Sequence, residues 1–277
     1  MEWNGLWSLV YGLLGGLFEF LPVSPYVHQQ VLLKITGLDA PGYGLSLAVH
    51  LGALAAVVIA SYAKISKLNR ERKIVKQPRR NRKRQPDFAS LMELRLLRIA
   101  AVPVTLSCLA APWLKDNINR LWLLAVLTAL NGLLVLLPQY MTRANKDARS
   151  LSPLDATLVG LGGALGALPG ISNFGLLTSV SSMRGMDRQF GLEFAYLLMI
   201  PVLSMLCISD LFMIFFAGNP VSGVTFFSGI LACIASFGAG YAGISFMRFL
   251  AKKESGEGFA CYNWGLAMFA FVFYLIG

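Results

Sequence analysis

Residues 19–24 read EFLPVS and residues 167–172 read ALPGIS, and these two short stretches decide the fold. Each interrupts an apolar run with a proline, which removes a backbone donor and clashes with the preceding helical turn, so we expect a helix to break at Pro22 and at Pro169. In hydrocarbon, a broken backbone persists only where protein or a water-filled cavity satisfies its free polar groups. The two stretches therefore predict polar segments buried inside a membrane protein.

Six other apolar stretches are each near the twenty residues that cross a hydrocarbon core. The chain is 56% hydrophobic and 14% charged, with a mean hydropathy of +0.62, which excludes a soluble domain. Residues 1–21 have no basic region ahead of their apolar run and are expected to be mature structure. We predict one all-α integral membrane domain over residues 1–277, with spans over residues 43–63, 96–114, 119–138, 190–217, 221–247 and 259–277.

The positive charge is concentrated between the first two of these spans. Residues 64–98 hold thirteen Lys or Arg against three acidic residues, which accounts for the whole formal net charge of +10. The positive-inside rule makes residues 64–95 a cytoplasmic loop, an interpretation favoured over nucleic-acid binding, and its charge also attracts anionic headgroups. Following the spans from this loop places both termini outside and eight further basic residues inside: Arg143, Lys146, Arg149, Arg184, Arg188, Arg248, Lys252 and Lys253.

An offset of 147 residues relates the two halves of the chain. It aligns residues 14–16 with residues 161–163, both LGG, and pairs Pro22 with Pro169 without a gap. The predicted topology gives matched segments opposite orientations, which is typical of inverted repeats. The segment before Tyr43 and the segment 154–185 must each begin and end on one face, either as a re-entrant pair or as two spans. The repeat halves are approximately residues 5–138 and 152–277.

Two breaks that enter from opposite faces can meet near the middle of the membrane. The helices that restart after them would then point their N-termini inward. Backbone N–H groups and the helix dipole make such an end a natural site for phosphate. The pattern therefore predicts a polar, anion-binding site between the two breaks.

Residues 19–24 with His28, and residues 169–172 (PGIS), closely resemble motifs of the undecaprenyl-diphosphate phosphatase (bacitracin-resistance) family. The likeness covers nearly the whole chain except the basic loop. It implies six transmembrane helices plus two re-entrant helix pairs in a bacterial cytoplasmic membrane. It also implies hydrolysis of undecaprenyl diphosphate to undecaprenyl phosphate at the outer face, with a divalent metal, magnesium or calcium. The likeness continues through residues 51–52, Arg188, Glu193, residues 197–201 and Asp210.

The chain departs from that family at several motif positions. The family has an acidic or amide residue four positions before the retained glutamate, where this chain has Gly15, and a serine where it has Pro25. The family's second motif reads SRSG, whereas residues 172–175 read SNFG, so Asn173 replaces an arginine. Arginine binds phosphate with a planar, permanently charged fork that asparagine cannot reproduce. Leu177 occupies the family's threonine position, and Thr178 follows it.

The resemblance implies Glu19, His28 and Ser172 as candidate catalytic residues. Glu19 would bind the metal or act as a base, and His28 would act as a nucleophile or general acid, with a packing role as its alternative. Ser172 would donate a hydrogen bond to phosphate or cap the helix that follows. The candidate substrate-binding residues are Ser24, Gly170, Asn173, Thr178 and Arg188.

Four further residues carry weaker signals. An ionised side chain inside a membrane is costly, so we expect a function for Asp210 and leave Glu193 open between function and structure. His50 stands outside the motifs and is interpreted as structural. Arg188 either marks the cytoplasmic end of a span or reaches an anionic headgroup.

Two classes of function remain open from the sequence. In the first, the chain is a polyprenyl-diphosphate phosphatase in which another cation or a metal replaces the missing arginine. In the second, it binds or moves a polyprenyl phosphate without hydrolysis, and a regulatory protein that sequesters the lipid is indistinguishable from this case. The oligomeric state is left open, with a homodimer as one arrangement.

Overall fold

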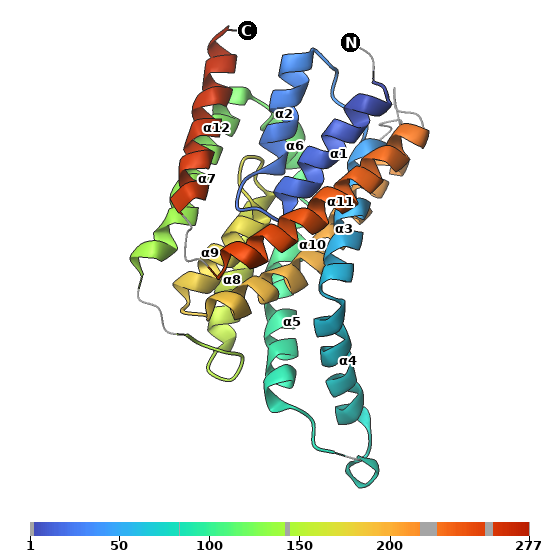
Figure 1. The fold of residues 1–277 in the computed structure, drawn as a ribbon, viewed down its shortest axis with the longest axis vertical. Coiled ribbons are helices and arrows are strands. Elements are labelled where there is room, and N and C mark those ends of the chain that lie inside the picture. Colours follow the sequence, from blue (N-terminus) through green and yellow to red (C-terminus); the bar gives the residue numbers. More distant parts are fainter. Residues whose placement is uncertain (1–2, 83, 142–144, 217–225, 253–256, 277) are drawn as a thin grey trace.

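The computed structural model describes residues 3–82, 84–141, 145–216, 226–252 and 257–276, which form helices without any named strand (Figure 1). Basic residues Lys83, Arg143 and Lys253, and residues 217, 221–225 and 277 of the predicted spans, lie outside the described residues. The elements are α1 (Gly5–Glu19), α2 (Pro25–Thr36), α3 (Tyr43–Ala60), α4 (Tyr62–Lys76), η1 (Arg79–Asn81), α5 (Phe88–Cys108), α6 (Ala111–Asn117), α7 (Leu121–Leu136), η2 (Leu137–Tyr140), α8 (Pro153–Ala164), η3 (Leu165–Ala167), α9 (Asn173–Met183), α10 (Arg188–Phe216), α11 (Phe226–Leu250) and α12 (Glu257–Ile276).

Six helical segments are long and apolar enough to cross a membrane, which confirms the number of predicted spans among the described residues. The protein is therefore a multi-pass membrane protein. α5 and α6 together form one of these segments, and α7 with η2 forms another. The six segments are Tyr43–Ala60, Phe88–Asn117, Leu121–Tyr140, Arg188–Phe216, Phe226–Leu250 and Glu257–Ile276.

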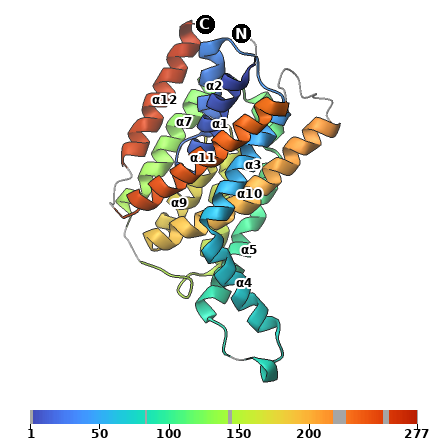
Figure 2. The same ribbon diagram turned by 45° about the vertical axis from the view of Figure 1, so that its right-hand side comes forward.

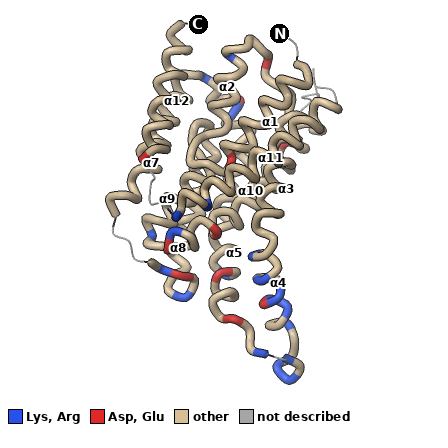
Figure 3. Tube along the Cα trace, in the orientation of Figure 1, with Lys and Arg blue, Asp and Glu red and all other residues tan. Residues whose placement is uncertain are grey.

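The basic segment, predicted as a cytoplasmic loop over residues 64–95, is mostly helical, and its cytoplasmic location stays a prediction. α4 follows α3 after Ser61, and α5 begins at Phe88, capped by the Asp87 side chain, which accepts from the Ala89 N–H. Lys64 Nζ lies 2.8 Å from Glu93 Oε2, and this ion pair joins α4 to α5. Figures 2 and 3 show α4 and the first turns of α5 extending away from the other helices as a lysine- and arginine-rich hairpin. We call α4, η1 and the first turns of α5 the basic hairpin.

The predicted helix breaks are confirmed at both prolines. Pro22 lies between α1 and α2, and Pro169 lies between η3 and α9. The offset of 147 residues also carries the start of α2, Pro25, to within one residue of the start of α9, Asn173. The orientation of the two halves in a membrane stays a prediction.

Glycines allow the helix that precedes each break to pack closely on a neighbour. A Cβ at Gly16 of α1 would lie 2.2 Å from the Ser236 carbonyl oxygen of α11. In the second half, a Cβ at Gly160 of α8 would lie 2.3 Å from the Ala100 carbonyl oxygen of α5. Both distances are far below van der Waals contact, so each crossing requires the absence of a side chain.

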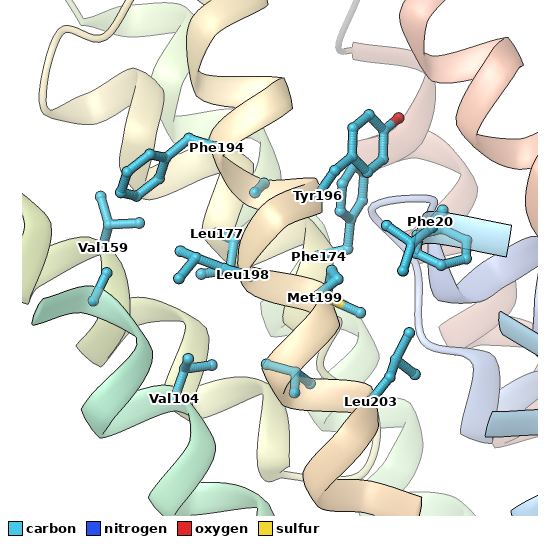
Figure 4. Packing of buried hydrophobic residues seen from close by; sticks show 14 of the residues in the cluster. Phe20, Val104, Val159, Phe174, Leu177, Phe194, Tyr196, Leu198, Met199 and Leu203 are labelled. Carbon is cyan, nitrogen blue, oxygen red and sulfur yellow. The ribbon is translucent and has the colours of Figure 1, made fainter. Parts of the chain in front are cut away.

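The main hydrophobic cluster packs both breaks against α10 (Figure 4). Phe20 follows α1, Phe174 lies in the first turn of α9, and both rings are fully buried beside Tyr196 of α10. The ring centroids of Phe174 and Tyr196 are 5.1 Å apart, and those of Phe20 and Tyr196 are 6.3 Å apart. Because the two breaks share this cluster, their backbones are held in fixed relative positions.

Candidate active site

The two breaks contact each other through hydrogen bonds. Ser172 Oγ donates to the Leu21 carbonyl at 3.0 Å and accepts from the Gly175 N–H at 3.0 Å, so it both links the breaks and caps α9. The predicted contact between the breaks is confirmed, while their entry from opposite faces of a membrane stays a prediction. The capping role proposed for Ser172 is confirmed as well, while its catalytic role stays a prediction.

Two buried asparagines complete this contact. Asn131 of α7 donates to the Pro22 carbonyl at 3.2 Å, and its Oδ1 accepts from the Ser172 N–H at 3.0 Å. Asn263 of α12 donates to the same carbonyl at 3.0 Å, and its Oδ1 accepts from Asn131 at 2.9 Å. These bonds satisfy backbone groups that the breaks leave free. We call Leu21, Pro22, Asn131, Ser172 and Asn263 the polar junction.

Sequence reasoning missed both asparagines, although a signal was present. Each is an amide inside an otherwise apolar span, where an unsatisfied polar side chain is costly. That cost predicts a partner within the protein. It does not identify which of the many backbone groups the partner is.

A cavity of about 60 Å³ lies beside the polar junction. We call it the Glu19 cavity, and four predicted site residues line it: Glu19, Ser24, Ser172 and Asn173. The Glu19 side chain is buried, with 8% of the residue exposed, and no hydrogen bond or ion pair to its carboxylate is found among the described residues. A buried carboxylate without a protein partner is a marker of function rather than of packing. Residues that sequence reasoning did not single out also line the cavity, among them Tyr26, Gln29 and Lys115, and so does His50, which was predicted to be structural.

The cavity has several groups that suit an anion. α2 begins beside it at Pro25, and the preceding Ser24 makes no side-chain cap to the described part of this helix, so its hydroxyl is available. Lys115 of α6 is half-buried on the wall, with Nζ 5.5 Å from the centroid of the Tyr26 ring. A helix N-terminus and an ammonium group together favour phosphate.

The surroundings of two substituted motif positions, Gly15 and Asn173, differ: one is filled by a neighbouring side chain, and the other carries an acceptor without a partner among the described residues. The Gln29 amide fills the space beside Gly15, since a Cβ at Gly15 would lie 2.9 Å from Gln29 Nε2. Asn173 Oδ1 is buried and has no hydrogen-bond partner in the part of the chain that the structure describes. Since Asn173 also lines the Glu19 cavity, this acceptor is open to a ligand bound there.

His28 does not line the Glu19 cavity. Its Nδ1 lies 2.7 Å from the Ser24 carbonyl, its Nε2 lies 2.8 Å from the Tyr262 hydroxyl, and its ring stacks on Phe18 at 3.6 Å. Both ring nitrogens therefore have protein partners. The structure supports the packing alternative for His28, and its catalytic role stays a prediction.

The remaining predicted substrate residues lie elsewhere. Thr178 and Arg188 line a second cavity of about 310 Å³, together with Pro22 and Lys252, and neither lines the Glu19 cavity. Gly170 has a φ of +104°, and a Cβ there would lie 2.7 Å from the Leu127 Cβ, so glycine is required for the turn against α7. The structure thus divides the predicted substrate residues between two cavities and a turn.

Both acidic residues of α10, Glu193 and Asp210, have basic partners. Glu193 forms a bidentate pair with Arg248 of α11, at 2.8 and 3.0 Å. Arg248 also donates to the Ala60 carbonyl and lies 5.3 Å from the centroid of the Tyr196 ring. This arrangement supports the structural alternative for Glu193. Asp210 pairs with His50, at 2.7 Å between Oδ2 and Nδ1.

The donor set of the Glu19 cavity suits a hard cation only when a ligand contributes to it. Among the described residues, no group of three or more His, Cys, Asp or Glu side chains is placed to hold a metal. The cavity offers the Glu19 carboxylate with hydroxyl and amide oxygens. Magnesium in proteins is commonly held by one or two carboxylates together with substrate phosphates, so the site fits a metal shared with a phosphorylated ligand.

Comparison with known proteins agrees with the resemblance. The family model described as "Bacitracin resistance protein BacA" matches residues 8–269. A protein named undecaprenyl-diphosphatase from Carboxydothermus hydrogenoformans is 30% identical over 270 residues, covering 96% of this chain and 95% of the relative. Another of that name from Treponema denticola is 30% identical, covering 94% and 98%. Undecaprenyl-diphosphatase 1 from Shouchella clausii is 25% identical, covering 96% and 95%.

Proposed function

This chain belongs to the bacitracin resistance protein BacA family, and we propose that it hydrolyses undecaprenyl diphosphate to undecaprenyl phosphate and inorganic phosphate. The observation that carries the proposal is the Glu19 carboxylate, which has no partner among the described residues and lies in a cavity with a helix N-terminus and Lys115. The relatives matched over nearly the whole chain are named for this reaction, and a non-hydrolytic carrier is not favoured.

The cavity suits the terminal phosphoryl group rather than the whole lipid. Its volume of about 60 Å³ is far too small for a polyprenyl chain. The prenyl chain then remains among the apolar helix surfaces and the acyl chains of the bilayer. Binding energy from the chain and the second phosphate would hold the reacting phosphorus in place.

The residues around the cavity would take distinct roles. The N-terminal amides of α2, the Ser24 hydroxyl and the Lys115 ammonium would bind the phosphoryl oxygens and stabilise charge that develops on them. Lys115 is the candidate for the cation that replaces the arginine missing at position 173. A divalent cation would be held by Glu19 together with the diphosphate oxygens, where it would neutralise charge.

The sidedness of the protein follows the distribution of charge. We propose that the basic hairpin is cytoplasmic and that both termini lie outside, in a bacterial cytoplasmic membrane. Figure 1 places the ends of the described chain at the pole opposite the hairpin. The Glu19 cavity includes α6, at the end of α5 remote from the hairpin, which supports action at the outer leaflet.

The proposal is tested by phosphate release from undecaprenyl diphosphate by the purified full-length protein, with and without magnesium or calcium. We expect release by the wild type and a loss of roughly 10²-fold or more in kcat with Glu19→Gln, in the range typical of a catalytic carboxylate. The control is Glu71→Gln, since Glu71 is a carboxylate with 1% of the residue exposed in the basic hairpin and does not line the cavity. Lipid binding without release by the wild type would contradict the proposal and restore the non-hydrolytic alternative.

A further inference from the structure

The Glu19 cavity contains a histidine that the function proposed above does not use. His50 of α3 and Asp210 of α10 are buried, with 7% and 3% exposed. His50 Nδ1 lies 2.7 Å from Asp210 Oδ2, and His50 itself lines the cavity. A carboxylate only accepts hydrogen bonds, so Nδ1 carries the hydrogen and Nε2 of the neutral ring presents a lone pair.

The surroundings of Nε2 set His50 apart from His28. Among the described residues, no hydrogen bond to His50 Nε2 is found, whereas both nitrogens of His28 have partners. Glu19 and Lys115, from α1 and α6, line the same cavity, and within the described structure no hydrogen bond joins either of them to His50. A histidine that is held by a carboxylate through one nitrogen, and whose ring lines a ligand cavity, has the arrangement of a general base.

We propose that His50, positioned by Asp210, is the proton-accepting residue of the Glu19 cavity. The inference rests on the proposed phosphatase function and names the group that activates water in it. The water donates its hydrogen to His50 Nε2 while its oxygen forms a bond to the terminal phosphorus. The bond from that phosphorus to the bridging oxygen breaks, and its electron pair leaves on undecaprenyl phosphate. The proton then passes from Nε2 to one of the two phosphate products, which restores the neutral ring.

A purely structural pairing of α3 with α10 is the competing explanation. It would need only the Nδ1 contact, and a glutamine side chain in place of the imidazole keeps a hydrogen-bond donor for Asp210, since the glutamine amide also donates. The two explanations therefore differ in what His50→Gln does. Loss of the base lowers kcat, whereas loss of a structural contact that glutamine replaces changes neither kcat nor the folded state.

The test compares kcat and KM for undecaprenyl diphosphate in the wild type, His50→Gln, Asp210→Asn, Asp210→Glu and Ser236→Ala. Ser236 Oγ donates to the Val49 carbonyl at 2.7 Å, so Ser236→Ala removes a buried bond to α3 beside His50 without changing the cavity's charged groups. We expect His50→Gln to lower kcat by roughly 10²- to 10⁴-fold, as for other general bases, with KM unchanged. Asp210→Asn should lower kcat less, Asp210→Glu should recover part of the loss, and Ser236→Ala should match the wild type.

Each outcome decides between the explanations. An active wild type with an unchanged His50→Gln overturns the role of His50 and leaves the phosphatase function standing. An inactive wild type overturns both.

If His50→Gln does not fold, the wild type is treated with diethyl pyrocarbonate, which acylates a free imidazole nitrogen. Inactivation with modification at His50, prevented by undecaprenyl phosphate, supports the proposal, and inactivation with modification confined to His28 overturns it.

Discussion

At the scale of single residues, the positive charge of the Glu19 cavity comes from Lys115 and not from the arginine that the family motif has at position 173. Position 173 carries an asparagine whose Oδ1 has no hydrogen-bond partner among the described residues, and the ammonium of Lys115 lines the same cavity. Lysine is a mobile point charge, whereas arginine binds two oxygens in a fixed plane. Such a site is expected to attract the diphosphate but to orient it less strictly.

The role of Lys115 gives the first prediction at this scale. Lys115→Met should raise KM for undecaprenyl diphosphate roughly 10- to 100-fold, because a hydrogen bond to a charged group contributes about 1.5–3 kcal/mol. Steady-state phosphate release at varied lipid concentration measures the change. Lys34→Met is the control, since Lys34 is exposed near the end of α2. An equal rise in KM in both variants would mean that general surface charge, and not this site, attracts the lipid.

Part of the site could be predicted from the sequence because its residues are neighbours along the chain. Glu19, Ser24, Ser172 and Asn173 flank the two prolines, and a helix break brings such residues to one place. His50 and Lys115 of the cavity come from α3 and α6, and no local pattern shows that these helices pack there. His50 was interpreted as structural for this reason, since its partner Asp210 is 160 residues away.

At the scale of helices, spans and breaks were predictable and the polar helix was not. Long apolar runs and prolines have strong local effects on the backbone. α4 has no apolar run, and the sequence signal for a loop was its charge. Ion pairs to α5 and to the segment before it stabilise this helix, and they depend on the fold of the hairpin as a whole.

The crossing of α1 and α11 leads to a prediction about glycine. Gly16→Ala should destabilise the protein by about 1–3 kcal/mol, as expected for an overpacked contact, because the new Cβ would meet the Ser236 carbonyl oxygen. Thermal unfolding in detergent measures the effect. The control is Gly265→Ala in α12, where no described atom lies within 4 Å of the added Cβ and the higher helix propensity of alanine should stabilise slightly. Similar unfolding temperatures for the two variants would show that α1 can move away from α11 at little cost.

At the scale of the whole molecule, the basic hairpin is stabilised separately from the membrane core. Glu71 accepts hydrogen bonds from Arg84 and from the Asp87 N–H, and these bonds lower the pKa of Glu71 below its ordinary value of 4.5. A depressed pKa in the folded state means that the contact contributes stability above the ordinary pKa. That stability is lost as the pH falls through the folded value.

This linkage predicts that acid opens the hairpin before it unfolds the core. Hydrogen exchange of the amides of α4, corrected for the intrinsic effect of pH on exchange, should accelerate below pH 4.5 in the wild type. In Glu71→Gln the exchange should be faster at neutral pH and respond less to acid. Exchange in α10 is the internal control and should change little over the same range. Acceleration of α4 and α10 together would instead indicate one cooperative unit.

The polar junction also constrains how the protein is made. The Pro22 carbonyl lies near the start of the chain, yet one of its two side-chain donors, Asn263, belongs to the last helix. During synthesis, the first break therefore enters the bilayer long before its full set of partners exists. Until α12 has been inserted, water or an insertion factor must supply the hydrogen bonds of that carbonyl. Truncation before residue 263 thus removes α12 and also leaves the first break, at Pro22, without one of its hydrogen-bond donors.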